Sequence, residues 1–246
     1  MQTIVPLYGF GGVPYSAVRK AAPRNILDNS DFTNLVAQAG IGGNHGTIAY
    51  AADRWILDSG TVSYAAGVGL TLNGTIRQKL EFPPTGETSA FVGMASGAAS
   101  ISYADGAVTI TSSGGVLKWA ALYGGVYSAA TMPDYQPKGY GAELLECQRY
   151  FFAPVSQQFG FANSTTGGLV LINLPTIFRI LPTITGYISW IRTEGKHISS
   201  GLSNATLSVS ASDHTSAAVV SIGNVSGLTA HKAMYVAINC QLSADL

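Results

Sequence analysis

The stretch Ser102-Tyr-Ala-Asp-Gly-Ala-Val-Thr-Ile-Thr111 gives the clearest indication of the fold. Its two halves alternate apolar and polar residues, which is the pattern of half-buried β-strands. Between them stands Asp105-Gly106, a pair that favours the two-residue turn of a β-hairpin because both residues tolerate a positive φ. The sequence therefore predicts two antiparallel strands, at residues 99–103 and 107–111, joined by a tight turn.

Similar short β-rich runs recur along the chain, separated by Gly, Asn and Asp at intervals of roughly ten residues. In the first half of the chain we expect strands at residues 54–57, 61–65, 69–72, 76–82, 89–94, 99–103, 107–111 and 116–123. In the second half we expect them at residues 158–162, 168–174, 183–192, 206–210, 217–222 and 233–242. This spacing predicts an all-β protein with two β-sandwich or jelly-roll-like domains.

One segment, at residues 140–152, has helical character. A period of 3.6 residues places on one side of this segment Leu144, Leu145, Gln148, Phe151 and Phe152. Pro154 ends the helix, because the residue before a proline is biased away from helical conformation. The short helix would join the two domains, which we place at residues 25–138 and 139–246.

Residues 1–24 differ from the rest of the chain. The run Tyr8-Gly-Phe-Gly-Gly12 is aromatic and rich in glycine, and Arg19, Lys20 and Arg24 concentrate positive charge. Such a segment cannot bury a core of its own, so we expect an extended N-terminal segment that is either disordered or docked on another molecule.

The composition excludes several classes of protein. The 13 basic and 13 acidic residues give a net charge of zero, so we expect no nucleic-acid partner. The 47% hydrophobic content argues against a disordered chain. We also expect no membrane insertion and no secretory signal, because long apolar runs and a charged leader are missing from the sequence. With only 11% charged residues, so apolar a chain is expected to bury surface in an oligomer.

The sequence offers no motif for a metal or a cofactor. Its four histidines are isolated and no C-x-x-C pair occurs, so no metal site is expected. Cys147 and Cys240 are predicted to be reduced, buried thiols. We expect no cofactor and no enzymatic activity.

Four carboxylates lie near predicted strands and are the candidates for catalysis: Asp53, Asp58, Glu81 and Asp105. We interpret them as turn residues or as ion-pair partners of Arg54, Arg77 or Lys79. A glycosidase remains an open alternative, since its two acids can be distant in sequence.

Aromatic residues are more informative. Trp and Tyr side chains on a β-sheet present a flat apolar face and a polar edge, which suits the C–H faces of sugar rings. Trp55 and Trp119 lie within strongly apolar strands and are predicted to be core. Trp190 precedes the charged loop Arg192-Thr-Glu-Gly-Lys-His197, which is either a contact surface or a solvated hairpin end. The candidate glycan contacts are Tyr187, Trp190, Arg192 and His197.

Asn25-Ile-Leu-Asp-Asn-Ser-Asp-Phe-Thr33, followed by Tyr50-Ala-Ala-Asp-Arg-Trp55, resembles the "NLL-N-F … DRW" opening of carbohydrate-binding-module-like β-sandwich domains in bacteriophage and prophage tail proteins. Four later segments of this chain resemble the end of such a domain and the C-Q-R-Y-aromatic helix that follows it. They are Val116-Leu-Lys-Trp-Ala-Ala-Leu-Tyr-Gly-Gly125, Ala130-Thr131, Pro137-Lys-Gly-Tyr140 and Glu143-Leu-Leu-Glu-Cys-Gln-Arg-Tyr-Phe151. Their "LP–MR–PT–T" segment is similar to Leu174-Pro-Thr-Ile-Phe-Arg-Ile-Leu-Pro-Thr-Ile-Thr185. Those proteins usually have Leu-Glu where this chain has Leu122-Tyr123, which weakens the transfer of a calcium or sugar contact to this position.

The resemblance implies a virion component, assembled in the bacterial host cytoplasm: a tail-fibre or receptor-binding protein that binds host surface polysaccharide. Residues 1–24 would then contact other virion proteins, with the candidate attachment residues Tyr8, Phe10, Tyr15 and Arg19. The same resemblance implies a homotrimer. Two alternatives stay open, namely a capsid or neck decoration protein (a head fibre) without glycan binding, and a depolymerase.

Overall fold

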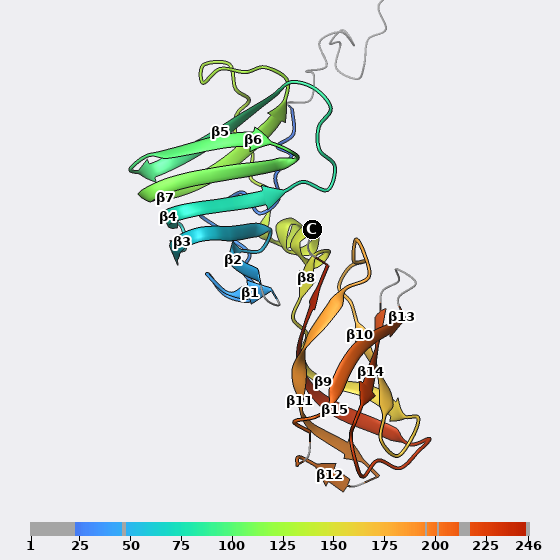
Figure 1. Ribbon diagram of the computed structural model, residues 1–246. Helices are drawn as coiled ribbons and strands as arrows, with labels where there is room; N and C mark the ends of the chain where they lie inside the picture. The colour runs from blue at the N-terminus through green and yellow to red at the C-terminus, as the bar shows by residue number, and fades with distance from the viewer. Residues whose placement is uncertain (1–22, 46–47, 195, 201, 212–216, 245–246) are drawn as a thin grey trace, which may run out of the picture.

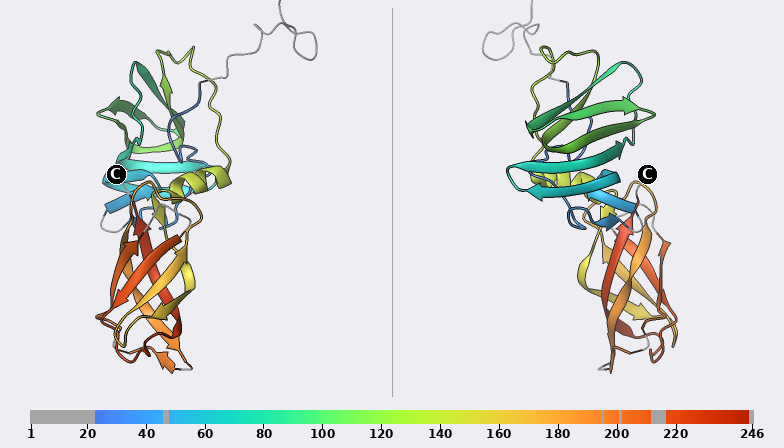
Figure 2. Two further views of the ribbon diagram at one scale, coloured as in Figure 1. Left: turned by 90° about the vertical axis from the view of Figure 1, so that its right-hand side faces the viewer. Right: turned by 60° about the vertical axis from the view of Figure 1, so that its left-hand side comes forward.

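The computed structural model describes residues 23–45, 48–194, 196–200, 202–211 and 217–244, which form two β domains. They lie end to end, with α1 (Tyr140–Gln148) between them (Figure 1). Two further views show the same elongated arrangement (Figure 2). The predicted all-β fold of two domains joined by one short helix is confirmed.

The N-terminal domain is built on a seven-stranded antiparallel sheet. Its strands, in spatial order, are β1 (Asn44–His45), β2 (Ile48–Ala52), β3 (Trp55–Ala65), β4 (Gly69–Lys79), β7 (Ala107–Gly124) and β5 (Thr88–Ser96), with β6 (Ala99–Ala104) also paired to β7. The predicted hairpin is present between β6 and β7, and its turn residues Asp105 and Gly106 have φ of 51° and 74°. Trp55 is fully buried in the core of this domain, as predicted.

Several predicted strands are continuous in the structure. Residues 54–57 and 61–65 belong to one strand, β3, and residues 69–72 and 76–82 to another, β4, which ends at Lys79. The predicted breaks are wrong because Gly60 and Gly74 stand opposite each other and let both strands continue beside a register shift. In the same way, the predicted strands at 107–111 and 116–123 merge into β7.

The segment around residues 25–31 lies along β7. Ile26 donates its backbone N–H to the carbonyl of Leu122, and Ala120 donates its own to Ser30, at 3.0 and 2.9 Å. The Asn29 side chain donates to the backbone oxygens of Val36 and Asp53 at 2.8 and 2.7 Å. Residues 25–31 therefore close the N-terminal domain through backbone pairing with β7 and through the hydrogen bonds of the Asn29 side chain.

Helix α1 is shorter than predicted and buries another face. It ends at Gln148, because Phe151 and Phe152 form the short strand β8 (Phe151–Phe152) instead of a last helical turn. Leu145, expected on the inner face, is 51% exposed, whereas Glu143 and Cys147 are buried. The reason is polar: the Glu143 carboxylate accepts the backbone N–H of Asn29 at 2.7 Å.

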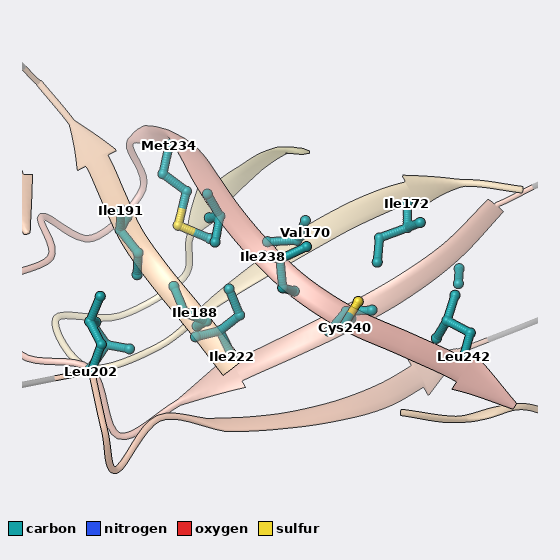
Figure 3. Close-up of a cluster of buried hydrophobic side chains, with 14 of the residues drawn as sticks. Val170, Ile172, Ile188, Ile191, Leu202, Ile222, Met234, Ile238, Cys240 and Leu242 are labelled. Carbon is teal, nitrogen blue, oxygen red and sulfur yellow. The ribbon is translucent and has the colours of Figure 1, made fainter. Parts of the chain in front are cut away.

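The C-terminal domain is an eight-stranded antiparallel sheet. Its strands, in spatial order, are β12 (Lys196–Ile198), β11 (Thr183–Thr193), β15 (Ala233–Ser243), β9 (Val155–Ala162), β10 (Gly168–Asn173), β14 (Ala217–Gly223) and β13 (Thr206–Ala211), with β8 also paired to β15. The sheet curls so that β11 and β13 contact each other. Its inner side chains form one hydrophobic core, in which residues of opposite strands point toward one another (Figure 3).

Candidate functional site

Strand β11 presents its aromatic residues to solvent. Ile188 and Ile191 are buried in the core, while Tyr187 and Arg192 are exposed on the outer face. Trp190 would share the inner face with Ile188 if the strand were regular, because side chains alternate with a period of two. A register shift between Ile188 and Trp190 inserts one extra residue opposite β15. This bulge places Trp190 on the outer face, where it is half-buried.

The strand register brings distant residues into line with Arg192. His197 on β12 pairs with Arg192, Arg192 pairs with Tyr235 on β15, and Tyr235 pairs with Phe159 on β9. Side chains of paired residues share a face of the sheet, so these four form a row across four strands. The Phe159 and Tyr235 ring centroids are 4.4 Å apart.

A second row leaves room for a pocket. Trp190 pairs with Ala237, and Ala237 pairs with Gln157, so a small side chain lies between an indole and an amide. The Trp190 ring centroid is 5.4 Å from that of His197. Together, residues of the two rows line a pocket of about 570 Å³ that is open to solvent. We call it the distal pocket; it is lined by Gln157, Trp190, Arg192, His197 and Tyr235.

The distal pocket lies at the end of the molecule away from the N-terminal domain. Strand β12, which carries His197, forms that end in Figure 1 and Figure 2. The loop beside it is held by an ion pair of 2.8 Å between Lys232 and Glu194, and this pairing lowers the pKa of the Glu194 carboxyl. Glu194 is therefore kept ionised and already has a partner.

The structure brings together three of the four predicted glycan contacts. Trp190, Arg192 and His197 line the distal pocket. Tyr187 lies outside it on the same strand, where its hydroxyl accepts a hydrogen bond from the Asn239 amide at 3.0 Å. The candidate attachment residues lie outside the described residues: Tyr8, Phe10, Tyr15 and Arg19.

Sequence reasoning missed Gln157 and Tyr235. Tyr235 belongs to a predicted strand in which buried Met234, Val236 and Ile238 alternate with outward residues, so its exposure could have been read from the period. Gln157 precedes the predicted strand at 158–162 by one residue. The sequence around Gln157 and Tyr235 does not indicate which strands lie beside theirs. The order of the strands in the sheet brings these two residues close to Trp190, so the sequence alone could not predict it.

Next to the distal pocket runs an exposed apolar stripe. Phe159, Phe161 and Leu171 are 64%, 49% and 49% exposed. Phe159 pairs with Leu171 of β10, so the stripe continues the row that starts at His197. We call these three residues the apolar stripe.

A second polar region joins the two domains. The Tyr150 hydroxyl donates to Glu81 at 2.6 Å, and the guanidinium groups of Arg149 and Arg179 lie 3.2 and 3.8 Å from the same carboxylate. The Arg54 guanidinium lies 3.4 Å from the centre of the Tyr150 ring. Burial raises the pKa of Tyr150, which keeps the hydroxyl protonated as a donor. Buried Nε atoms of Arg54 and Arg179 have no hydrogen-bond partner among the described residues, so the region is held by ion pairs and ring contacts as well as by the Tyr150 hydrogen bond. We interpret it as the structural joint of the domains.

The interpretation of the four carboxylates holds for three of them. Asp58 accepts hydrogen bonds from Nε and one terminal nitrogen of Arg77 at 2.9 Å, Asp105 lies in the hairpin turn, and Asp53 lies in the turn between β2 and β3, where it also accepts hydrogen bonds from Gln38. The expected partner of Glu81 is wrong. Glu81 follows the end of β4 and pairs with Arg149 and Arg179 of the joint instead.

Two further expectations, on the cysteines and on Trp119, can be compared with the described residues. Cys147 and Cys240 are free and buried, as predicted, and burial raises the pKa of the Cys240 thiol to about 11. Trp119 was expected in the core but is half-buried, stacked on Tyr135 at 4.9 Å. Among the described residues no group of three or more His, Cys, Asp or Glu side chains could hold a metal ion, and no helix could span a membrane.

Comparison with protein-family models, with curated proteins and with solved structures found no match. The fold and the pocket therefore define the class of this protein: it is an all-β protein of two domains, with an exposed pocket on its C-terminal sheet that aromatic residues help to line.

Proposed function

We propose that this protein is a virion fibre or receptor-binding component that binds host surface glycan in the distal pocket. The main observation behind this proposal is that Trp190 and Tyr235 line one exposed pocket together with three polar side chains. Aromatic faces pack against the C–H faces of sugar rings. The amide of Gln157, the Arg192 guanidinium and the His197 imidazole supply hydrogen bonds that orient a sugar.

The position of the pocket supports this role in a particle. The first described segment, blue in Figure 1, starts at the end of the N-terminal domain that faces away from the C-terminal domain. An attachment by residues 1–24 would then leave the distal pocket at the outer end of the subunit. The resemblance of residues 25–246 to phage tail proteins supports the virion location. The same resemblance, to fibre proteins, supports a homotrimer.

The apolar stripe favours a second candidate function. Phe159, Phe161 and Leu171 carry no hydrogen-bonding side-chain groups, so they suit contact with protein better than contact with sugar hydroxyls. If the whole outer face is covered by other virion proteins, the chain is a capsid or neck decoration protein without glycan binding.

An array of bacterial surface polysaccharides distinguishes the two functions. We expect the full-length protein to bind a subset of glycans, and Trp190→Ala to weaken this binding roughly thirtyfold, because a central interface Trp is worth about 2 kcal/mol or more. Phe82→Ala is the matched control, since Phe82 is 78% exposed on the other domain. Binding by this variant should not change.

Three outcomes would contradict the proposal. Trp190→Ala could bind as well as the original protein, which would place the glycan elsewhere. The free energy of unfolding of Trp190→Ala could fall by about 3–5 kcal/mol, as is typical when a core Trp is truncated, which would make Trp190 a core residue. Binding of no glycan by the full-length protein would leave the decoration function. Release of reducing sugar from host capsule would instead indicate a depolymerase.

A further inference from the structure

The distal pocket contains an arginine without an ion-pair partner. Of the six described arginines, four have a carboxylate within 4.0 Å, namely Arg54, Arg77, Arg149 and Arg179, whereas Arg24 and Arg192 have none among the described residues. Arg192 is exposed, and within the described part of the chain it has no ion-pair partner. Its neighbour Glu194 is already paired with Lys232. The pocket lining contains no carboxylate of its own. The guanidinium therefore stands uncompensated beside two aromatic rings.

We infer that the distal pocket selects an acidic saccharide, one that carries a carboxylate on the sugar ring, with Arg192 as the residue that determines specificity. This inference rests on the proposed glycan-binding function of the same pocket. A guanidinium presents parallel N–H donors whose geometry matches a carboxylate, and the two groups form paired, charge-assisted hydrogen bonds.

The strand register places the Arg192 guanidinium beside the aromatic rings on which a sugar would stack. Arg192 lies between Tyr235 and His197 in one row of the sheet, and Trp190 lies on the same face of the same strand. A sugar ring packed on Trp190 or Tyr235 would direct a ring substituent toward Arg192. His197 and Gln157, at the two sides of the pocket, remain for hydroxyl groups.

The test compares each glycan bound on the array with its carboxyl-reduced form, which keeps the sugar backbone and removes the charge. We expect reduction to weaken binding about tenfold or more, and Arg192→Gln to weaken binding of the acidic form by a similar factor. Arg192→Lys keeps the charge without the planar donors and should retain part of the affinity. Lys118→Gln, an exposed charge removal on β7, is the matched control.

The outcomes separate this inference from the proposed function. Equal binding of native and carboxyl-reduced glycans, with binding still lost in Trp190→Ala, overturns the acidic selectivity alone. Equal binding of phosphate-bearing glycans that lack carboxylates overturns the assignment to a carboxylate. Binding that depends on neither Trp190 nor Arg192, or no binding at all, overturns both the inference and the proposed site.

Discussion

Trp190 faces outward because its strand contains one extra residue. The register shift after Ile188 moves the indole from the core face to the pocket face. No glycine or proline marks this bulge, since the local sequence is Ile188-Ser-Trp190. The charged loop that follows was enough to suggest a contact surface, but whether Trp190 lies in the core or on that surface could be decided only from the strand register.

Glu143 is a buried acid, although it is not among the residues that the helical period places on one side of the segment. Burial raises the pKa of its carboxyl, although the Asn29 N–H and the Lys138 ammonium oppose this shift. A raised pKa means that the folded state holds the proton more tightly than the unfolded state. The contribution of Glu143 to stability is therefore greatest at low pH and is lost as the pH rises through the folded-state pKa.

The variant Glu143→Gln tests this sign. Its free energy of unfolding relative to the original protein should improve as the pH rises from about 4 toward 7, because glutamine cannot ionise. Urea denaturation at a series of pH values measures the difference. A relative stability of Glu143→Gln that falls with rising pH would show instead that the ionised carboxylate is favoured in the fold.

At the scale of elements, glycine signals were read well at turns and poorly within strands. Asp105-Gly106 forms the predicted turn, with both residues at positive φ. Gly60 and Gly74 lie in the gaps between the predicted strands, yet they pair with each other inside the β3–β4 ladder. A glycine can end a strand at a turn or stay within it, and only the partner strand decides between the two.

Gly60→Ala tests the role of this pair. A Cβ at Gly60 would lie 1.9 Å from the carbonyl oxygen of Asn73, and its φ of 89° is unfavourable for alanine. We expect a loss of about 1–3 kcal/mol in the free energy of unfolding. The control is Gly67→Ala, which has a similar φ of 75° but open space around the new Cβ. Equal losses in the two variants would refute the close approach of the strands.

Four strands were not predicted. β1, β8 and β12 have two, two and three residues, which is too few to show a period, and the five residues of β2, Ile48–Ala52, show no alternation of apolar and polar side chains. β12 nevertheless contributes His197 to the distal pocket, since it is held in place by pairing with β11. The candidate site was predictable in part for the same reason: Trp190, Arg192 and His197 are close in sequence, whereas Gln157 and Tyr235 are not.

At the scale of the molecule, the two domains are held by contacts between residues far apart in sequence. Glu81 of the N-terminal domain binds Arg149, Tyr150 and Arg179. The His45 ring stacks on Phe151 with centroids 3.7 Å apart. Periodicity within single segments contains no information about such pairs. The two domains form an elongated molecule, and β12, which carries His197 of the distal pocket, lies at the end away from the N-terminal domain (Figure 2).

Assembly is predicted at this scale. A chain that begins at Asn25 retains the described domains except Pro23 and Arg24, so it should keep its thermal stability and, by light scattering, the mass of three subunits. It should fail to join the virion, because the proposed attachment segment is missing. A mass near one subunit at micromolar concentration would exclude oligomerisation, a mass of two would exclude only the trimer, and normal incorporation would exclude the attachment role.

The proposed glycan-binding role of the distal pocket is best tested by a crystal structure of the protein with a bound oligosaccharide chosen from the array. We expect a sugar ring packed on Trp190 or Tyr235, with a polar group of the sugar hydrogen-bonded to Arg192. An oligosaccharide bound at the domain joint, at the apolar stripe or on the N-terminal sheet, with the distal pocket empty, would contradict it.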